Sequence, residues 1–120
     1  MPDDPARTAR SRADVEHLLD DALAAADEDD PALPHFVSDP RAGLAGVIAT
    51  VEWVLGHTHA TPITGDHTPV TVRVWSRERG RALDVIEGAS GRIRGITDDY
   101  AAFVKRTLDW IGIPSANRPL

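Results

Sequence analysis

The chain has 120 residues, no cysteine and a formal net charge of −6. This length fits one domain with a single core, and the lack of cysteine excludes disulfides, a thiol nucleophile and thiolate zinc sites. The acidic balance argues against general binding to nucleic acid, and without a signal peptide or a long apolar run we expect a cytoplasmic protein with no membrane contact.

The first predicted helix covers residues 12–27 and follows a flexible tail of residues 1–10. Ser11 can cap this helix, with Asp14 three residues further on. Apolar residues then recur at the spacing of one helix face: Val15, Leu18, Leu19, Ala22 and Leu23. The stretch "DEDDPALP" ends the helix, because acids are unfavourable at the C-terminal end of the helix dipole and prolines follow.

A second helix is predicted from Pro40 to the residue before Gly56. Asp39 can serve as its N-cap, proline suits the first helical position, and glycine can adopt the left-handed conformation that ends helices. The segment between is apolar nearly all round, which is typical of a central helix. Its apolar stripe consists of Leu44, Val47, Ile48, Val51, Val54 and Leu55. Because Gly43 and Gly46 weaken a helix, we expect another backbone to approach them closely.

Residues 57–69 are predicted to form a loop, followed by a third helix over about 69–87. This helix can start at Thr68-Pro69 or only near Val74, and "VTVRVW" alternates as a strand does, so residues 70–75 stay open between helix and strand. Its expected core residues are Val72, Trp75, Ala82, Val85 and Ile86.

A glycine-rich connector, "GASGRIRG", leads to a fourth helix over residues 98–111, which Thr97 can cap. One face of this helix carries Tyr100, Val104, Thr107, Leu108 and Ile111, and residues 114–120 are expected to be a flexible tail. The sequence therefore predicts an all-α fold, a small bundle of about four helices around a central apolar helix, with residues 11–113 as its single domain.

Two of the three tryptophans stand in similar settings, Trp53 in "TVEWVLG" and Trp110 in "TLDWIG". At 100° per residue, Trp53 lies nearly opposite the apolar stripe of its own helix. Either it packs on another part of the same chain, or it meets a second subunit together with Ala45, Ala49 and Glu52. The second interpretation makes these four residues candidates for an interaction site.

The motif "WVLG" followed by "PITG", with "LDW" near the C-terminus, resembles small uncharacterised helical proteins of high-GC actinobacteria and their phages. The resemblance covers about half of the chain and rests on Trp53, Leu55, Gly56, Pro62, Ile63, Gly65 and Trp110. It implies a helical fold and such a source, and it implies no activity.

Three histidines fall within eleven residues, His57, His59 and His67, with Asp66 beside the last. Imidazole and carboxylate groups can complete a zinc shell, so these residues are the candidates for a metal site. Their spacing matches no metal signature, and solvated loop histidines are the simpler interpretation. A metal-binding protein or an enzyme that uses this loop stays an alternative.

The arginine-rich segment 73–94 holds six arginines and three acids, whereas residues 1–39 hold three arginines and eleven acids. Arg77 and Arg81 are therefore further candidates for an interaction site, either with an acidic protein surface or, as an alternative function, with nucleic acid. Pairing with the acidic first helix, within the chain or across a dimer, is the simpler use.

No catalytic residue and no cofactor follow from the sequence. We therefore expect a non-enzymatic interaction or accessory protein that associates with itself, as a structural or regulatory component of a phage or mobile element.

Overall fold

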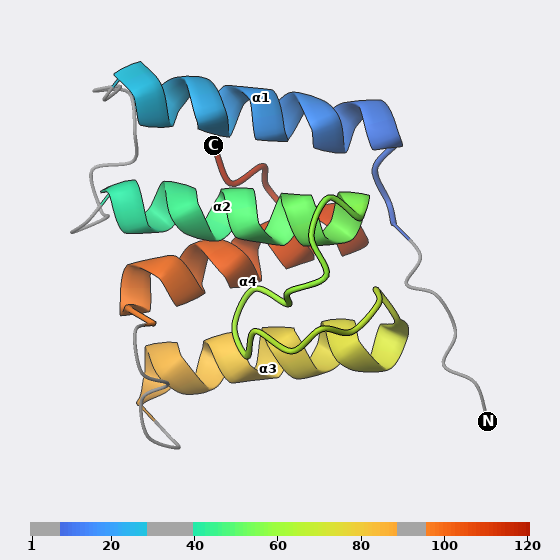
Figure 1. Cartoon of the computed structure of the whole chain (residues 1–120), viewed down its shortest axis with the longest axis vertical. Coiled ribbons are helices and arrows are strands. Elements are labelled where there is room, and N and C mark those ends of the chain that lie inside the picture. Colours follow the sequence, from blue (N-terminus) through green and yellow to red (C-terminus); the bar gives the residue numbers. More distant parts are fainter. Residues whose placement is uncertain (1–7, 29–39, 89–95) are drawn as a thin grey trace.

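The computed structural model describes residues 8–28, 40–88 and 96–120, which form an all-α bundle (Figure 1). Its helices are α1 (Arg12–Glu28), α2 (Pro40–Leu55), α3 (Val72–Glu87) and α4 (Asp98–Gly112). The predicted fold class is confirmed. Asp39, most of the acidic stretch after α1 and most of the glycine-rich connector lie outside the described residues.

The helix ends follow the capping signals of the sequence at most of the described positions. Ser11 Oγ accepts a hydrogen bond from Asp14 N at 3.1 Å, and Thr97 Oγ1 accepts one from Tyr100 N at 3.2 Å. Gly56 adopts a left-handed φ of 80° directly after α2. Helix α3 starts later than Thr68-Pro69, because Thr71 is its N-cap and accepts a hydrogen bond from Val74 N at 3.2 Å.

Helices α2 and α4 lie side by side in the middle of the molecule, with α1 packed on α2 and α3 packed on α4 (Figure 1). The expected close approach of another backbone is confirmed at Gly46, whereas the group nearest to Gly43 is a side chain. A Cβ atom on Gly46 would lie 2.5 Å from Tyr100 O, and one on Gly43 would lie 2.8 Å from the Phe103 ring. The two central helices can therefore pack this tightly only because α2 lacks side chains at these positions.

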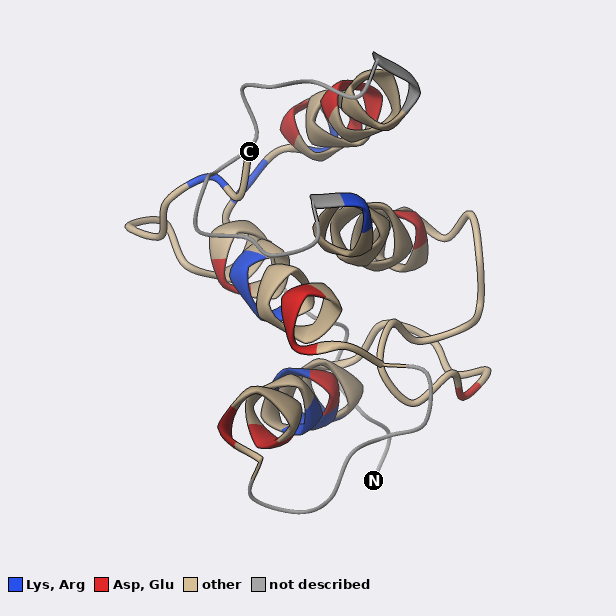
Figure 2. Ribbon diagram, turned by 90° about the vertical axis from the view of Figure 1, so that its left-hand side faces the viewer, with Lys and Arg blue, Asp and Glu red and all other residues tan. Residues whose placement is uncertain are grey.

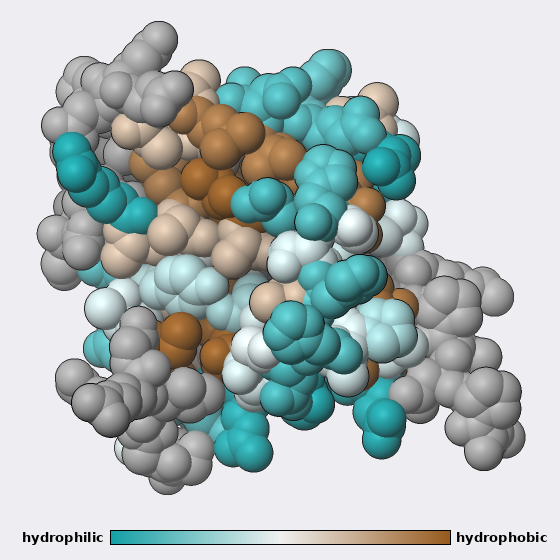
Figure 3. Space-filling model, in the orientation of Figure 1, coloured by the Kyte–Doolittle hydropathy of each residue, from teal (hydrophilic) through white to brown (hydrophobic). Residues whose placement is uncertain are grey.

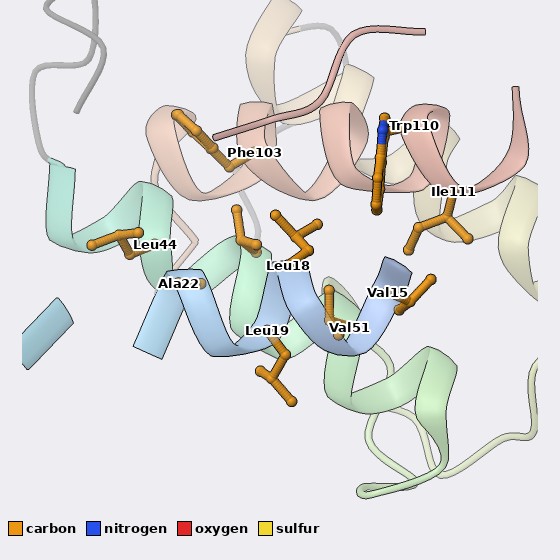
Figure 4. Packing of buried hydrophobic residues seen from close by; sticks show 10 residues of the cluster. Val15, Leu18, Leu19, Ala22, Leu44, Val51, Phe103, Trp110 and Ile111 are labelled. Atoms are coloured by element: carbon orange, nitrogen blue, oxygen red, sulfur yellow. The ribbon is translucent and has the colours of Figure 1, made fainter. Parts of the chain in front are cut away.

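The core has two parts, which meet at α2 and α4. In the first part, side chains of α1, α2 and α4 interdigitate, as Figure 4 shows for Leu18, Val51 and Trp110. The second part lies between α2, α3 and α4, and Trp53 and Leu108 are fully buried in it. The central position predicted for the second helix is thus confirmed, since it contributes to both parts.

Three residues expected in the core are instead partly exposed. Leu23 is 46% exposed, Val72 51% and Ile86 38%. In α3 the inward stripe is Val74, Glu78, Ala82 and Val85. Val72 and Ile86 are exposed because the side of α3 that faces the interior is the side that carries the carboxylate of Glu78.

Both ends of the described chain pack on the bundle. Arg10 donates hydrogen bonds to the carbonyl oxygens of Trp110, Ile113, Pro114 and Ala116, and its guanidinium lies 4.9 Å from the centre of the Trp110 ring. It thereby supplies a cation to the carbonyl end of α4, whose own last turn has none. Pro119 is buried and Arg118 pairs with Asp21, so residues 114–120 lie against the bundle rather than trailing from it.

Candidate functional site

Trp53 lies inside the chain. Its side chain is 1% exposed, its ring centroid is 6.3 Å from that of Trp75, and its indole N–H donates to Thr68 O at 3.0 Å. The interpretation of Trp53 as a contact to a second subunit is therefore wrong, because almost no surface of the ring is left for a partner. The interpretation that it packs on another part of the same chain is correct.

The loop of residues 56–71, which covers Trp53, fills the space between α2 and α3 (Figures 1 and 2). It turns back on itself, with an isolated antiparallel bridge between Ala60 and His67 and a hydrogen bond from Thr61 N to Asp66 O at 3.0 Å. Its residues Thr61, Pro62 and Ile63 are buried. This loop is a packed part of the fold, as compact surface loops often are.

A buried carboxylate on α3, that of Glu78, holds this loop in place. Oε1 accepts hydrogen bonds from Ile63 N at 2.9 Å and Thr64 N at 3.0 Å, and Oε2 accepts one from Thr64 Oγ1 at 3.0 Å. Arg77 Nε lies 3.3 Å from Oε2. We refer to this set of contacts as the Glu78 latch. A further hydrogen bond connects the loop to α4: the phenolic O–H of Tyr100 donates to Pro62 O at 2.7 Å.

The Glu78 latch keeps the carboxylate ionised although its side chain is fully buried. Burial on its own would raise the pKa of Glu78, but the hydrogen bonds from the backbone N–H groups of Thr64 and Ile63 and from the hydroxyls of Thr61 and Thr64 outweigh it. The net pKa is lowered. Burial and the nearby Glu78 charge together raise the pKa of Tyr100, which therefore stays a hydrogen-bond donor.

The candidate metal ligands all lie on the outside of this loop. His57, His59, His67 and Asp66 are exposed, and Asp66 pairs with Arg77 at 3.2 Å. Within residues 8–28, 40–88 and 96–120, no group of three or more histidine, aspartate or glutamate side chains is placed to hold a metal ion. The described geometry therefore lends no support to a metal centre at this loop.

Arg77, Arg79 and Arg81 of α3 pair with carboxylates of the loop, of α3 and of α4. Arg77 contacts Asp66 and Glu78, and Arg81 lies 4.0 Å from Asp84. Helices α1 and α3 lie at opposite edges of the molecule (Figure 2). Pairing of the α3 arginines with α1 inside one chain, which the sequence suggested, is therefore wrong, while pairing between two chains is untested. Arg92 and Arg94 lie outside the described residues.

The remaining candidates lie on the outer face of α2. Ala45 is exposed, and Ala49 and Glu52 are half-buried. Ile48 of the same helix is half-buried, and Leu23 of the neighbouring helix α1 is 46% exposed. Figure 3 shows hydrophobic side chains gathered over α1 and α2 on this side of the molecule. We call Leu23, Ala45, Ile48 and Ala49 the α1–α2 face.

Sequence reasoning missed two of these features. Glu78 stands between Arg77 and Arg79 in a charged segment, although its spacing from Val74 and Ala82 places it on their face. Leu23 continues an apolar stripe, and this pattern predicts a core position. Its exposure follows from the position of α1 at the edge of the bundle, where, among the described helices, α1 packs mainly on α2.

Comparisons of the chain with models of known protein families, with curated proteins and with solved structures gave no match. None of the helices in the described residues has the length and apolar character needed to cross a lipid bilayer.

Proposed function

We propose that the protein is a non-enzymatic helical interaction protein that binds a second copy of itself through the α1–α2 face. The observation that carries this proposal is the partly exposed apolar surface of that face, on which the alanines of α2 leave room for another helix. Exposed apolar surface on a protein often marks a site of contact with a partner. Trp53 has no direct part in it.

The order of residues along the outer side of α2 favours a two-fold, antiparallel pairing of this helix with its copy. Arg41, Ala45, Ile48 and Glu52 follow one another at helical spacing, with the cation and the acid at opposite ends about 16 Å apart. In an antiparallel pair centred between Ala45 and Ile48, Arg41 of each copy faces Glu52 of the other. A two-fold interface requires such self-complementarity.

This role suits an accessory component rather than a catalyst, and the resemblance of the "WVLG" and "PITG" motifs supports a place in a phage or mobile element. A chain without cysteine is compatible with a reducing cytoplasm, which is the location that we propose.

Sedimentation velocity of the full chain tests the proposal. We expect a dimer of the wild type, a monomer of Ala45→Glu, and a dimer of the control Ala13→Glu, which places the same charge on an exposed position at the far end of α1. A wild type that stays monomeric up to about 1 mM, or a dimer unaffected by Ala45→Glu, would contradict it.

A further inference from the structure

A groove of about 190 Å³ lies between the first half of α3 and the end of α4. These two helix ends are on the right in Figure 1. Its apolar wall is formed by Val72, Trp75, Leu108 and Ile113. Its remaining lining residues are Ser76, Arg79, Asp109 and Gly112. The groove is distant from the α1–α2 face and has no part in the function proposed above.

The apolar wall of the groove continues onto the surface. Val72 is 51% exposed and Ile113 43%, so two of the large hydrophobic residues that the described chain exposes stand at this one place. Gly112 leaves the space beside the Trp75 ring open. A Cβ atom at this position would lie 3.4 Å from Cζ2 of the ring and would occupy part of the groove. Trp75 itself is half-buried and forms the aromatic side of the groove.

The polar end of the groove has a fixed cation. Arg79 donates from Nε to Asp109 Oδ1 at 2.6 Å, and Lys105 donates from Nζ to Asp109 Oδ2 at 2.7 Å. Two cations thus share one carboxylate. Among the described residues, the terminal amino groups of Arg79 have no hydrogen-bond partner, and the side chain is 39% exposed.

Asp109 remains ionised in this arrangement and holds the guanidinium in position. Burial alone would raise its pKa, but the hydrogen bonds and charges of Arg79 and Lys105 lower it. The carbonyl groups at the end of α4, which would otherwise repel an anion, already accept hydrogen bonds from Arg10. The three charged side chains at the polar end therefore leave a net charge of +1.

We propose that this groove binds a small monocarboxylate that carries an aromatic or branched apolar group. The apolar group would lie against Trp75 and Leu108, and the carboxylate would accept hydrogen bonds from the terminal amino groups of Arg79. A planar guanidinium matches a carboxylate in this way, with two parallel hydrogen bonds.

The size and charge of the groove define this class of ligand. A cavity of about 150 Å³ can hold benzene, so 190 Å³ accommodates a six-membered ring with a short arm. A ligand with two negative charges fits less well, because Asp109 stands directly beside Arg79 and would repel the second charge.

Titration of the isotopically labelled full chain with 3-phenylpropionate, followed by NMR, tests the proposal. The signal to follow is the indole N–H of Trp75, which its loss in Trp75→Phe identifies. We expect a saturable shift with a Kd of about 1 mM, about tenfold weaker binding of the neutral 3-phenylpropanamide, and no saturable shift with acetate.

A matched pair of variants then tests the role of the guanidinium. Arg79→Gln should raise the Kd for 3-phenylpropionate about tenfold, whereas Arg81→Gln, on an exposed part of the same helix, should change it by less than about twofold. The proposal is overturned if 3-phenylpropionate gives no saturable shift up to about 20 mM. It is also overturned if the amide binds as tightly as the acid, a comparison that uses the wild type alone and does not depend on the folding of a variant.

Discussion

Replacement of Glu78 by glutamine removes the charge of the Glu78 latch and keeps its shape. The carboxylate is fully buried and accepts three hydrogen bonds from the loop of residues 56–71. A hydrogen bond to a charged acceptor contributes about 1 kcal/mol more to stability than one to a neutral acceptor. In Glu78→Gln the new amide N–H₂ also stands opposite a donor, Arg77 Nε or an N–H of the loop. We therefore expect the free energy of unfolding to fall by about 3 kcal/mol.

Urea unfolding at several pH values measures this loss and identifies its cause. In the folded protein the pKa of Glu78 lies below its ordinary value of 4.5, so the stabilisation by the ionised carboxylate is present above pH 4.5. It is lost as the pH falls through the folded-state pKa. The difference between wild type and Glu78→Gln should therefore be largest at neutral pH and should shrink in acid.

Glu87→Gln serves as the control, because it makes the same chemical change at an exposed position at the end of α3. It should alter the free energy of unfolding by less than about 0.5 kcal/mol. The reasoning is refuted if Glu78→Gln has no larger effect than this control at neutral pH, or if its effect is the same at every pH.

Two further predictions concern packing. Trp53→Ala should lower the free energy of unfolding by about 3 kcal/mol or more, because the ring is fully buried, and light scattering should show no change in the mass of the assembly. Gly46→Ala should destabilise the protein by about 2 kcal/mol in urea unfolding, since the added methyl group would lie 2.5 Å from Tyr100 O. Gly80→Ala, with nothing within 4 Å of its new methyl group, should instead stabilise it by about 0.5 to 1 kcal/mol, and the opposite signs are the test.

The helices could be predicted because their signals are local. Each of the caps Ser11, Thr97 and Gly56 acts within a few residues of its helix end, and the apolar character of α2 is evident from its own segment. The sequence leaves the start of α3 open because Thr68-Pro69 and Thr71 offer similar capping chemistry, and the observed start at Val72 lies between Pro69 and Val74. Thr68 instead belongs to the loop, and its carbonyl oxygen accepts a hydrogen bond from the indole N–H of Trp53.

The candidate sites could be predicted less well, because they depend on contacts between distant segments. The hydrogen bonds of Glu78 come from residues 63 and 64, and Arg10 reaches the end of α4, about 100 positions further along the chain. The groove beside Trp75 exists only where α3 and α4 meet. A helical wheel also cannot show how far Leu23 or Val72 is exposed, because exposure depends on which neighbours the helix has.

The central claim, self-association through the outer side of α2, is tested most directly by exchanging its two charges. Arg41→Glu and Glu52→Arg should each weaken the dimer, because every facing pair then has like charges. An equimolar mixture of the two variants should restore a dimer in sedimentation velocity, since Glu at 41 of one chain would face Arg at 52 of the other. If each variant alone dimerises as tightly as the wild type, or if the mixture stays monomeric while the wild type is a dimer, the two-fold antiparallel pairing of α2 is contradicted.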